Sequence, residues 1–171
     1  SRYVAEVAHT GARIVDTRKT TPGLRAVERQ AVRDGGGHNH RFSLSDAVMV
    51  KDNHLAVLTA SGMSITQALE STIARLSHTT HVEVEVDRLD QIDPVLAAGV
   101  GTIMLDNFSL DDLRTGVELI AGRAQVEASG GVTLATVRAI AETGVDVISV
   151  GALTHSAPAL DLGLDVRVDG A

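Results

Sequence analysis

Residues 81–151 read HVEVEVDRLDQIDPVLAAGVGTIMLDNFSLDDLRTGVELIAGRAQVEASGGVTLATVRAIAETGVDVISVG, and this stretch decides the fold. Short runs rich in Val, Ile and Leu begin about every 20 residues within it, the length of a strand-plus-helix unit. The predicted strands are His81–Val86, Gly101–Leu105, Ala124–Ala128 and Val145–Val150. The predicted helices between them are Gln91–Ala98, Leu110–Ile120 and Leu134–Thr143. This alternation predicts a parallel sheet covered by helices.

The same alternation extends toward the N-terminus. Two further strands are predicted at Arg13–Asp16 and Ala47–Lys51, with helices at Arg2–Thr10, Leu24–Asp34 and Ser64–Ser77. Helix N-caps are predicted at Ser64, Ser109 and Thr133, because a short hydroxyl side chain can accept a hydrogen bond from the first helical turn. Helix C-terminal caps are expected near Gly99, Gly122 and Gly144.

Polar residues at the strand ends favour one of the two folds that this alternation allows, a doubly wound sheet or a (β/α) barrel. The chain has no G-x-G-x-x-G turn and no Walker A sequence. The strand ends read DTRK (16–19), KDNH (51–54), EVE (83–85), DN (106–107), EASGG (127–131) and SVG (149–151). Barrels carry their chemistry at these ends, so we predict an α/β fold, an incomplete TIM-like (β/α) barrel with about six to seven strands. A single catalytic domain, residues 1–171, is expected.

Composition argues against several kinds of function. Aromatic residues make up 2% of the chain, which argues against a nucleic-acid stacking surface. The absence of cysteine excludes a thiolate nucleophile and a cysteine-ligated metal. No apolar run approaches transmembrane length, and no signal peptide is visible. We therefore expect a cytoplasmic protein that binds neither nucleic acid nor membrane.

Positive charge is concentrated in the first third of an acidic chain. The net charge is −7, yet residues 1–51 hold nine Lys and Arg against five acids. The only two lysines, Lys19 and Lys51, both stand beside polar motif residues in this segment. Codon bias toward Arg explains why Lys is scarce, but it does not explain the positions of the two lysines. The segment is interpreted as a local anion site.

Two basic loops are predicted within this segment. Arg18 and Lys19 follow the first strand and precede Pro-Gly, as in a rigid anion-binding turn, although a solvated turn fits equally well. A glycine-rich loop at 35–41 ends in His40 and Arg41. Its two histidines at positions 38 and 40 could bind a metal, but the adjacent arginine favours an anion.

Lys51 ends the second predicted strand. A lysine there could form a Schiff base, as in barrel aldolases, if neighbouring cations lower its pKa. The same crowding of cations suits polyanion binding, which we favour because it also explains the other basic groups.

Acidic residues and glycine turns end the later strands. Glu85 and Asp106 could hold Mg²⁺ or sugar hydroxyls, or stabilise a developing oxocarbenium ion, although ordinary alternation also explains Glu83 and Glu85. The turns Ser129-Gly130-Gly131 and 149–155 are typical of a phosphate site shared by two consecutive final strands of a barrel.

The motifs DTRKTTPGLR, GGGHNHR and VKDNHL closely resemble those of quinolinate phosphoribosyltransferases. Further similar segments are EVEV, IMLDN, EASGGV and SVGALTHSAPALD, and the resemblance runs in order from Arg13 to Asp165. It implies that the chain takes part in de novo NAD biosynthesis. The reaction implied is the conversion of quinolinate and phosphoribosyl pyrophosphate, with Mg²⁺, into nicotinate mononucleotide, pyrophosphate and CO₂.

The resemblance also implies a role for each matching residue. Carboxylates of quinolinate would be bound by Thr17, Arg18, His40, Arg41 and Lys51. The catalytic residues would be Lys19 and Lys51, facing pyrophosphate, and Glu85 and Asp106, holding ribose hydroxyls and Mg²⁺ directly or through water. The 5′-phosphate would be surrounded by Ser129, Gly130, Gly151 and His155. No tuned general base and no covalent intermediate are expected.

Family members also carry an N-terminal sandwich domain, which is absent from this sequence. In the family an arginine from that domain of a partner subunit completes the site, so a homodimer or higher homo-oligomer is implied. The isolated chain could be inactive, and we expect it to expose apolar surface. Alternatives are a paralogue with another acceptor, such as a molybdenum-transport-associated relative or a nicotinate enzyme, the Lys51 aldolase, and a phosphate-binding barrel without activity.

Overall fold

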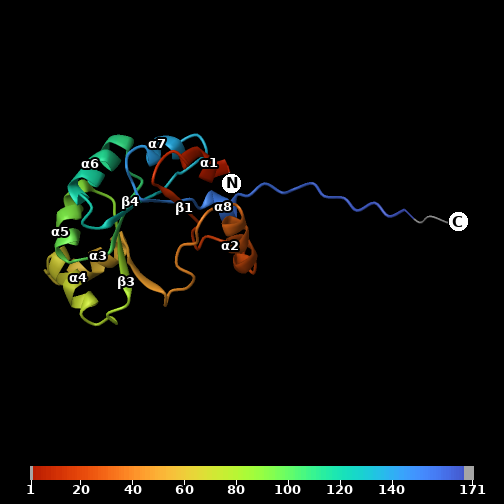
Figure 1. Ribbon diagram of the computed structural model, residues 1–171. Helices are drawn as coiled ribbons and strands as arrows, with labels where there is room; N and C mark the ends of the chain where they lie inside the picture. The colour runs from red at the N-terminus through yellow and green to blue at the C-terminus, as the bar shows by residue number, and fades with distance from the viewer. Residues whose placement is uncertain (1, 168–171) are drawn as a thin grey trace.

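The computed structural model describes residues 2–167 and contains one parallel sheet with helices along its outside (Figure 1). The strands are β1 Arg13–Val15, β2 Ala47–Val50, β3 His81–Val86, β4 Thr102–Asp106, β5 Gln125–Ser129 and β6 Val147–Ser149. The helices are α1 Arg2–Val7, α2 Arg25–Asp34, α3 Asp52–Thr59, α4 Ile65–Ile73, α5 Ile92–Ala97, α6 Leu110–Ile120, α7 Val137–Ala141 and α8 Ala152–His155. A 3₁₀ turn, η1 Leu89–Gln91, precedes α5.

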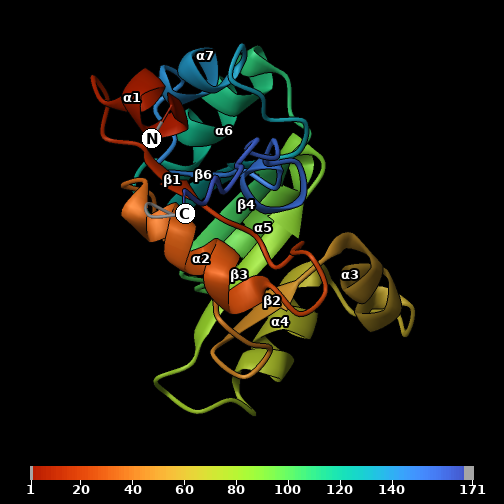
Figure 2. The same cartoon turned by 90° about the vertical axis from the view of Figure 1, so that its right-hand side faces the viewer.

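The sheet is an open barrel. Its strand order is β1-β6-β5-β4-β3-β2, and every pairing is parallel. In the described residues β1 and β2 do not pair with each other, and only a single parallel bridge, Val15 to His38, continues the sheet beyond β1. The prediction of an incomplete (β/α) barrel with six to seven strands is confirmed. Figure 2 views the molecule from the side on which α2 crosses in front of the sheet.

The two faces of the sheet differ in chemistry. Leu105 faces outward, because a Cβ added to Gly116 of α6 would lie 2.7 Å from its Cδ1 atom. Glycine therefore lets α6 pack closely on β4. Successive side chains of a strand alternate between faces, so Glu85 and Glu127, which pair with Met104, face inward. The outer face thus forms the helix-covered core, and the inner face carries carboxylates.

Most predicted elements are present, although several boundaries differ. Helix α6 has the predicted bounds, and Ser64 and Ser109 are N-caps whose side chains accept hydrogen bonds from Gln67 and Asp112. Thr133 is not an N-cap: α7 begins at Val137, with Thr136 before it. The sequence prediction also missed α3, which begins directly after Lys51.

Residues 156–167 extend away from the barrel without regular structure (Figure 1). Their apolar side chains are largely exposed, at 80% for Leu160, 85% for Leu162 and 88% for Leu164. Among residues 2–167, no helix combines the length and apolar character needed to cross a membrane.

Candidate active site at the carboxyl ends of the strands

The predicted site residues gather at one edge of the sheet. Because all six strands are parallel, their carboxyl ends lie on the same side of the barrel. Lys51 follows β2, Glu85 lies near the end of β3, and Asp106 ends β4. The others at this edge are Thr17, Arg18 and Lys19 after β1, Ser129 and Gly130 at the end of β5, and Gly151 and His155 after β6.

Lys51 and Glu85 form an ion pair between neighbouring strand ends. The Lys51 side chain is 47% exposed, whereas that of Glu85 is 12% exposed. The backbone N–H of Lys51 donates to Nδ1 of His54, 2.9 Å away, which fixes the start of α3. The lysine is thus half-exposed at the rim, with its ammonium held by Glu85.

Asp106 is held between β4 and β5. Its carboxylate accepts a hydrogen bond from the Ser129 hydroxyl and another, at 2.7 Å, from the Asn107 amide. Asn107 itself has a left-handed backbone (φ 58°), and its N–H donates to the Ser129 carbonyl at 2.9 Å. This network ties the acidic strand end to the glycine turn that follows β5.

The turn after β6 lies beside the turn after β1. A Cβ on Gly151 would be 2.8 Å from Nε2 of His155 and 3.7 Å from the Thr17 hydroxyl oxygen. The Thr154 hydroxyl donates to the Lys19 carbonyl at 2.6 Å. The first and last strands therefore bring their proposed anion-binding turns into direct contact.

His40 lies between two buried carboxylates of the inner face. Its Nε2 atom is 3.3 Å from Glu83 and 3.4 Å from Glu127, and both acids are 3% exposed. Burial lowers the pKa of His40, but hydrogen bonds and charge from Glu127 and Glu83 outweigh it and raise the pKa to about 10. Burial raises the pKa of Glu83, because it disfavours the charged carboxylate, and the hydrogen bond and charge of His40 only partly oppose this rise.

Hydrogen bonding at the other ring nitrogen opposes a metal in this cluster. Potential ligand atoms of His40, Glu83 and Glu127 lie within 4.8 Å of one another. However, the Arg41 backbone N–H donates to Nδ1 of His40 at 2.8 Å. In the neutral ring that bond uses the lone pair on Nδ1 and leaves the proton on Nε2, facing the carboxylates. Below the raised pKa the ring carries a second proton, on Nδ1, and the Arg41 N–H must then move away from this nitrogen.

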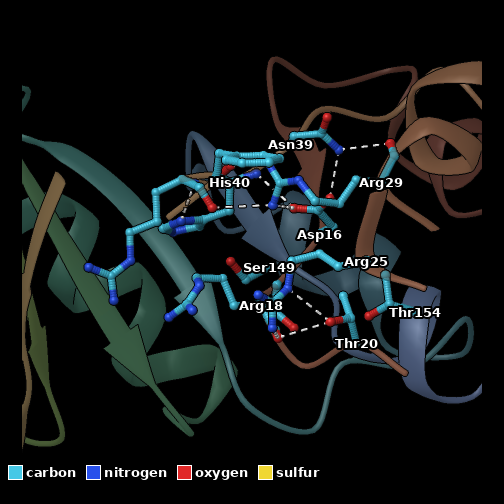
Figure 3. Close-up of polar contacts among 12 residues, drawn as sticks. Asp16, Arg18, Thr20, Arg25, Arg29, Asn39, His40, Ser149 and Thr154 are labelled. Atoms are coloured by element: carbon cyan, nitrogen blue, oxygen red, sulfur yellow. Dashed lines mark hydrogen bonds and ion pairs between the residues drawn. The ribbon is translucent and has the colours of Figure 1, made fainter. Parts of the chain in front are cut away.

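A buried ionic network supports the two basic loops from the helix side (Figure 3). Arg29 of α2 pairs with Asp16 at 3.2 Å, and the two side chains are 5% and 0% exposed. Asn39 donates to Asp16 at 2.6 Å. A neighbouring arginine, Arg25, donates to the Thr20 hydroxyl at 3.0 Å and to the Arg18 carbonyl at 3.3 Å. Sequence reasoning placed Asp16 among the functional strand ends, but its carboxylate faces α2.

Arg18 and Arg41 present their guanidinium groups differently. Arg18 has a buried Nε atom without a hydrogen-bond partner in the described residues. A buried donor of this kind favours an acceptor supplied by a ligand. Arg41 donates through one guanidinium nitrogen to the Ala47 carbonyl at 2.8 Å.

The fold and the site together define an α/β protein of the (β/α)-barrel class, with a cationic site at the strand ends suited to anionic ligands. The chain belongs to the family described as quinolinate phosphoribosyl transferase, C-terminal domain, whose model matches residues 1–165.

Similar curated proteins carry names of the same kind. A Bacillus subtilis protein named "Probable nicotinate-nucleotide pyrophosphorylase (carboxylating)" is 47% identical over 156 residues, which cover 91% of this chain and 53% of that protein. A Nicotiana glauca protein, "Quinolinate phosphoribosyltransferase (decarboxylating) 2, mitochondrial", is 43% identical and is matched over 99% of this chain and 52% of its own length. The chain spans about half the length of the curated relatives it matches.

Solved structures show the same fold. NadC from Streptococcus pyogenes superposes with a TM-score of 0.86 at 46% identity, covering 94% of this chain and 55% of that chain. Nicotinate-nucleotide pyrophosphorylase from Ehrlichia chaffeensis superposes with a TM-score of 0.88 at 40% identity, covering 97% and 59%.

Proposed function

We propose that the protein transfers the phosphoribosyl group of phosphoribosyl pyrophosphate to quinolinate, with loss of CO₂, to give nicotinate mononucleotide for NAD biosynthesis. The observation that carries the proposal is the gathering of basic side chains, inner-face carboxylates and two glycine turns at one rim, in a chain of this family. Both substrates are polyanions, and holding them together requires dense positive charge.

Quinolinate is the proposed ligand of the basic loops. Arg18, whose Nε has no hydrogen-bond partner in the part of the chain that the structure describes, and Arg41 would each bind a carboxylate through paired N–H donors, which suits the planar carboxylate. Thr17 and Lys51 complete this acceptor site in the proposal, and His40, whose Nε2 faces Glu83 and Glu127, contributes positive charge there rather than a direct hydrogen bond.

The phosphoribosyl donor would lie along the rest of the rim. Lys19 and Lys51 would face pyrophosphate and stabilise its charge as it leaves. The 5′-phosphate would sit at the turns that contain Ser129, Gly130, Gly151 and His155, where backbone N–H groups are available.

Glu85 and Asp106 are the proposed ligands of the ribose hydroxyls and of Mg²⁺. Both offer carboxylate oxygens at adjacent strand ends, and oxygen donors are what Mg²⁺ prefers. When bound, Mg²⁺ would neutralise pyrophosphate charge. The Lys51–Glu85 ion pair holds the lysine beside this position.

The bond changes balance without a covalent enzyme intermediate. The pyridine nitrogen bonds to ribose C1 as the bond from C1 to the pyrophosphate oxygen breaks, and the nitrogen becomes positive. The C2–carboxylate bond then breaks, CO₂ leaves, its electron pair stays on C2 beside the cationic nitrogen, and a solvent proton adds to C2. The protein's role is to orient both substrates and stabilise charge.

Two alternatives make different predictions. The Lys51 amine is engaged in an ion pair with Glu85, which disfavours a Schiff-base nucleophile. A paralogue whose acceptor has a single carboxylate would need only one carboxylate site, so the expectation that Arg18 binds one carboxylate and the His40–Arg41 loop binds the other favours quinolinate.

The proposal includes a homo-oligomer, a cytoplasmic location and a partner-supplied arginine. Size measurement of the native protein tests the first, and cell fractionation tests the second. The Nicotiana glauca relative is named mitochondrial, so fractionation has a real alternative outcome.

The assay uses the native protein that contains residues 1–171. Quinolinate labelled in its C2 carboxylate should release labelled CO₂ only when phosphoribosyl pyrophosphate and Mg²⁺ are both present. Nicotinate and other pyridine acids serve as competing acceptors. Absence of release from quinolinate, or faster turnover of another acceptor, would defeat the proposal.

A further inference from the structure

Helix α2 carries three arginines spaced four residues apart, and their surroundings differ. Arg25, Arg29 and Arg33 share one helix face because residues four apart are neighbours on an α-helix. Arg33 is exposed, and its side chain bonds only to Gln30 among the described residues. Arg29 is 4% exposed, which is rare for an arginine. Its burial needs a reason beyond helix formation.

Arg29 donates to the backbone of the glycine-rich loop. Its two terminal nitrogens reach the His40 carbonyl and the Arg41 carbonyl, the latter at 3.2 Å. The same guanidinium bonds Asp16, and its centre lies 5.6 Å from the Phe42 ring centroid. A planar group with several donors can bind consecutive carbonyls in this way, whereas a lysine ammonium is a single point charge.

Asp16 holds the other side of the same loop. One oxygen accepts the His40 backbone N–H at 2.8 Å, and the other accepts the Asn39 amide at 2.6 Å. Backbone bonds between Asp16 and His38, at 3.1 Å, and between His38 and Ile14, at 2.8 Å, add the short bridge to β1. The backbone carbonyl of His40 is therefore bound by Arg29 and its backbone N–H by Asp16, the two members of one buried ion pair.

The cost of burying this pair indicates a specific role. Removing two charges from water is expensive, and such a pair is weak evidence for stability. Here its hydrogen bonds go to the loop that supplies His40 and Arg41. The Arg41 N–H in turn lies 2.8 Å from Nδ1 of His40, so the backbone at residue 41 also bears on the orientation of the His40 ring.

We propose that Arg29 is a positioning residue for the acceptor: with Asp16 it fixes the backbone of residues 40 and 41, so that Arg41 meets the dicarboxylate while the His40 ring stays between Glu83 and Glu127. The identity of the ligand rests on the proposed function. The phosphoribosyl side of the rim is supported by other contacts, since Thr154 holds Lys19 and Ser129 bonds Asp106. Loss of Arg29 should therefore affect the two substrates unequally.

The kinetic test compares Arg29→Met, Arg29→Lys and Arg33→Met in the native protein. Arg33→Met removes the same charge from the same helix without touching the loop. For Arg29→Met we expect the KM for quinolinate to rise by about 10- to 100-fold, as small misplacement of a binding group can do, with little change in the KM for phosphoribosyl pyrophosphate. Arg29→Lys should recover part of this loss, and Arg33→Met should behave as wild type.

A second measurement does not depend on the reaction. Amide hydrogen exchange of the peptide spanning residues 38–42 should become faster in Arg29→Met and stay unchanged in Arg33→Met. If Arg29→Met does not fold, Arg29→Lys takes its place in both measurements.

The outcomes separate the two proposals. Unchanged exchange of residues 38–42 overturns the positioning role, whether or not quinolinate is the substrate. Equal rises in both KM values also overturn it, because they indicate general damage. If the wild-type protein does not turn over quinolinate while exchange responds as expected, the proposed function fails and the positioning of the loop by Arg29 stands.

Discussion

Gly130 lies so close to Asn107 that a Cβ at position 130 would be 2.1 Å from the Asn107 Oδ1 atom. Gly130 also has φ +87°, and Asn107 is one of the few non-glycine residues with positive φ. The turn after β5 and the residue after β4 therefore fit together only with glycine at position 130. The contact joins the proposed phosphate turn to the proposed Mg²⁺ ligand, Asp106.

Gly130→Ala should lower the unfolding free energy by about 1–3 kcal/mol, the usual range for local backbone strain, and should weaken phosphoribosyl pyrophosphate binding. Gly131→Ala is the matched control, because Gly131 has φ +59° but nothing within 4 Å of its added Cβ. Urea unfolding of both variants separates the loss of stability caused by the Asn107 clash from the loss caused by the positive φ angle. Equal losses in the two variants would contradict the importance of the Asn107 contact.

Glu127→Gln should change how stability depends on pH. The pKa of His40 is raised from 6.5 to about 10, with Glu127 a main cause. A raised histidine pKa stabilises the fold fully below about pH 6.5, and this contribution is lost as the pH rises through about 10. The difference in unfolding free energy between wild type and Glu127→Gln, measured by urea unfolding, should therefore become smaller as the pH rises from about 6.5 to about 10.

Glu118→Gln is the control for this comparison, since Glu118 is exposed on α6. Its stability difference from wild type should not vary with pH in this window. A gap between wild type and Glu127→Gln that stays constant from pH 6 to 10 would show that His40 does not titrate as described.

Lys51→Ala should lower kcat/KM by about 10²- to 10³-fold, the range seen when one group that stabilises transition-state charge is removed. The ion pair with Glu85 is also lost, but the lysine is 47% exposed and the fold should persist. Arg88→Ala is the control, since it removes an exposed cation whose ion pairs within residues 2–167 are with Asp87 and Asp90. Borohydride with a carbonyl compound should trap no adduct on Lys51, and an adduct would favour the aldolase alternative.

Asp106→Asn should raise the Mg²⁺ concentration needed for half-maximal activity by about 10-fold or more, as loss of a metal ligand does. Chelation of Mg²⁺ should stop wild-type turnover and readdition should restore it. Asp111→Asn, at a side chain that is 94% exposed, controls for the change in charge. An unchanged Mg²⁺ dependence in Asp106→Asn would remove this residue from the metal site.

The fold could be predicted from sequence because its signals are local and periodic. Val- and Ile-rich runs and helical segments repeat along residues 81–151, and Ser64 and Ser109 mark helix starts with their own side chains. Helix α3 was missed because its cap uses Lys51 and His54, a pair that is not an ordinary N-cap signal. The prediction of Thr133 as an N-cap was wrong because another hydroxyl residue three positions later, Thr136, directly precedes the helix.

The site could be predicted only as a set of strand ends. Parallel strands bring their carboxyl ends together, so Lys51, Glu85 and Asp106 were expected at one rim, and the structure places them there. The pairs that arrange the site were not predictable, because His40 meets Glu127 and Arg29 meets Asp16 only through tertiary packing. The alternation of side chains along each strand could have indicated that Glu127 faces the barrel interior, because it lies on the same face of the sheet as Glu85.

A crystal structure of the native protein with quinolinate bound tests directly where the acceptor binds. One quinolinate is expected at the strand-end rim, with its carboxylates contacted by Arg18 and Arg41 and its ring near Lys51. Quinolinate bound elsewhere, or at the rim without either arginine, would show that the basic loops do not form the acceptor site.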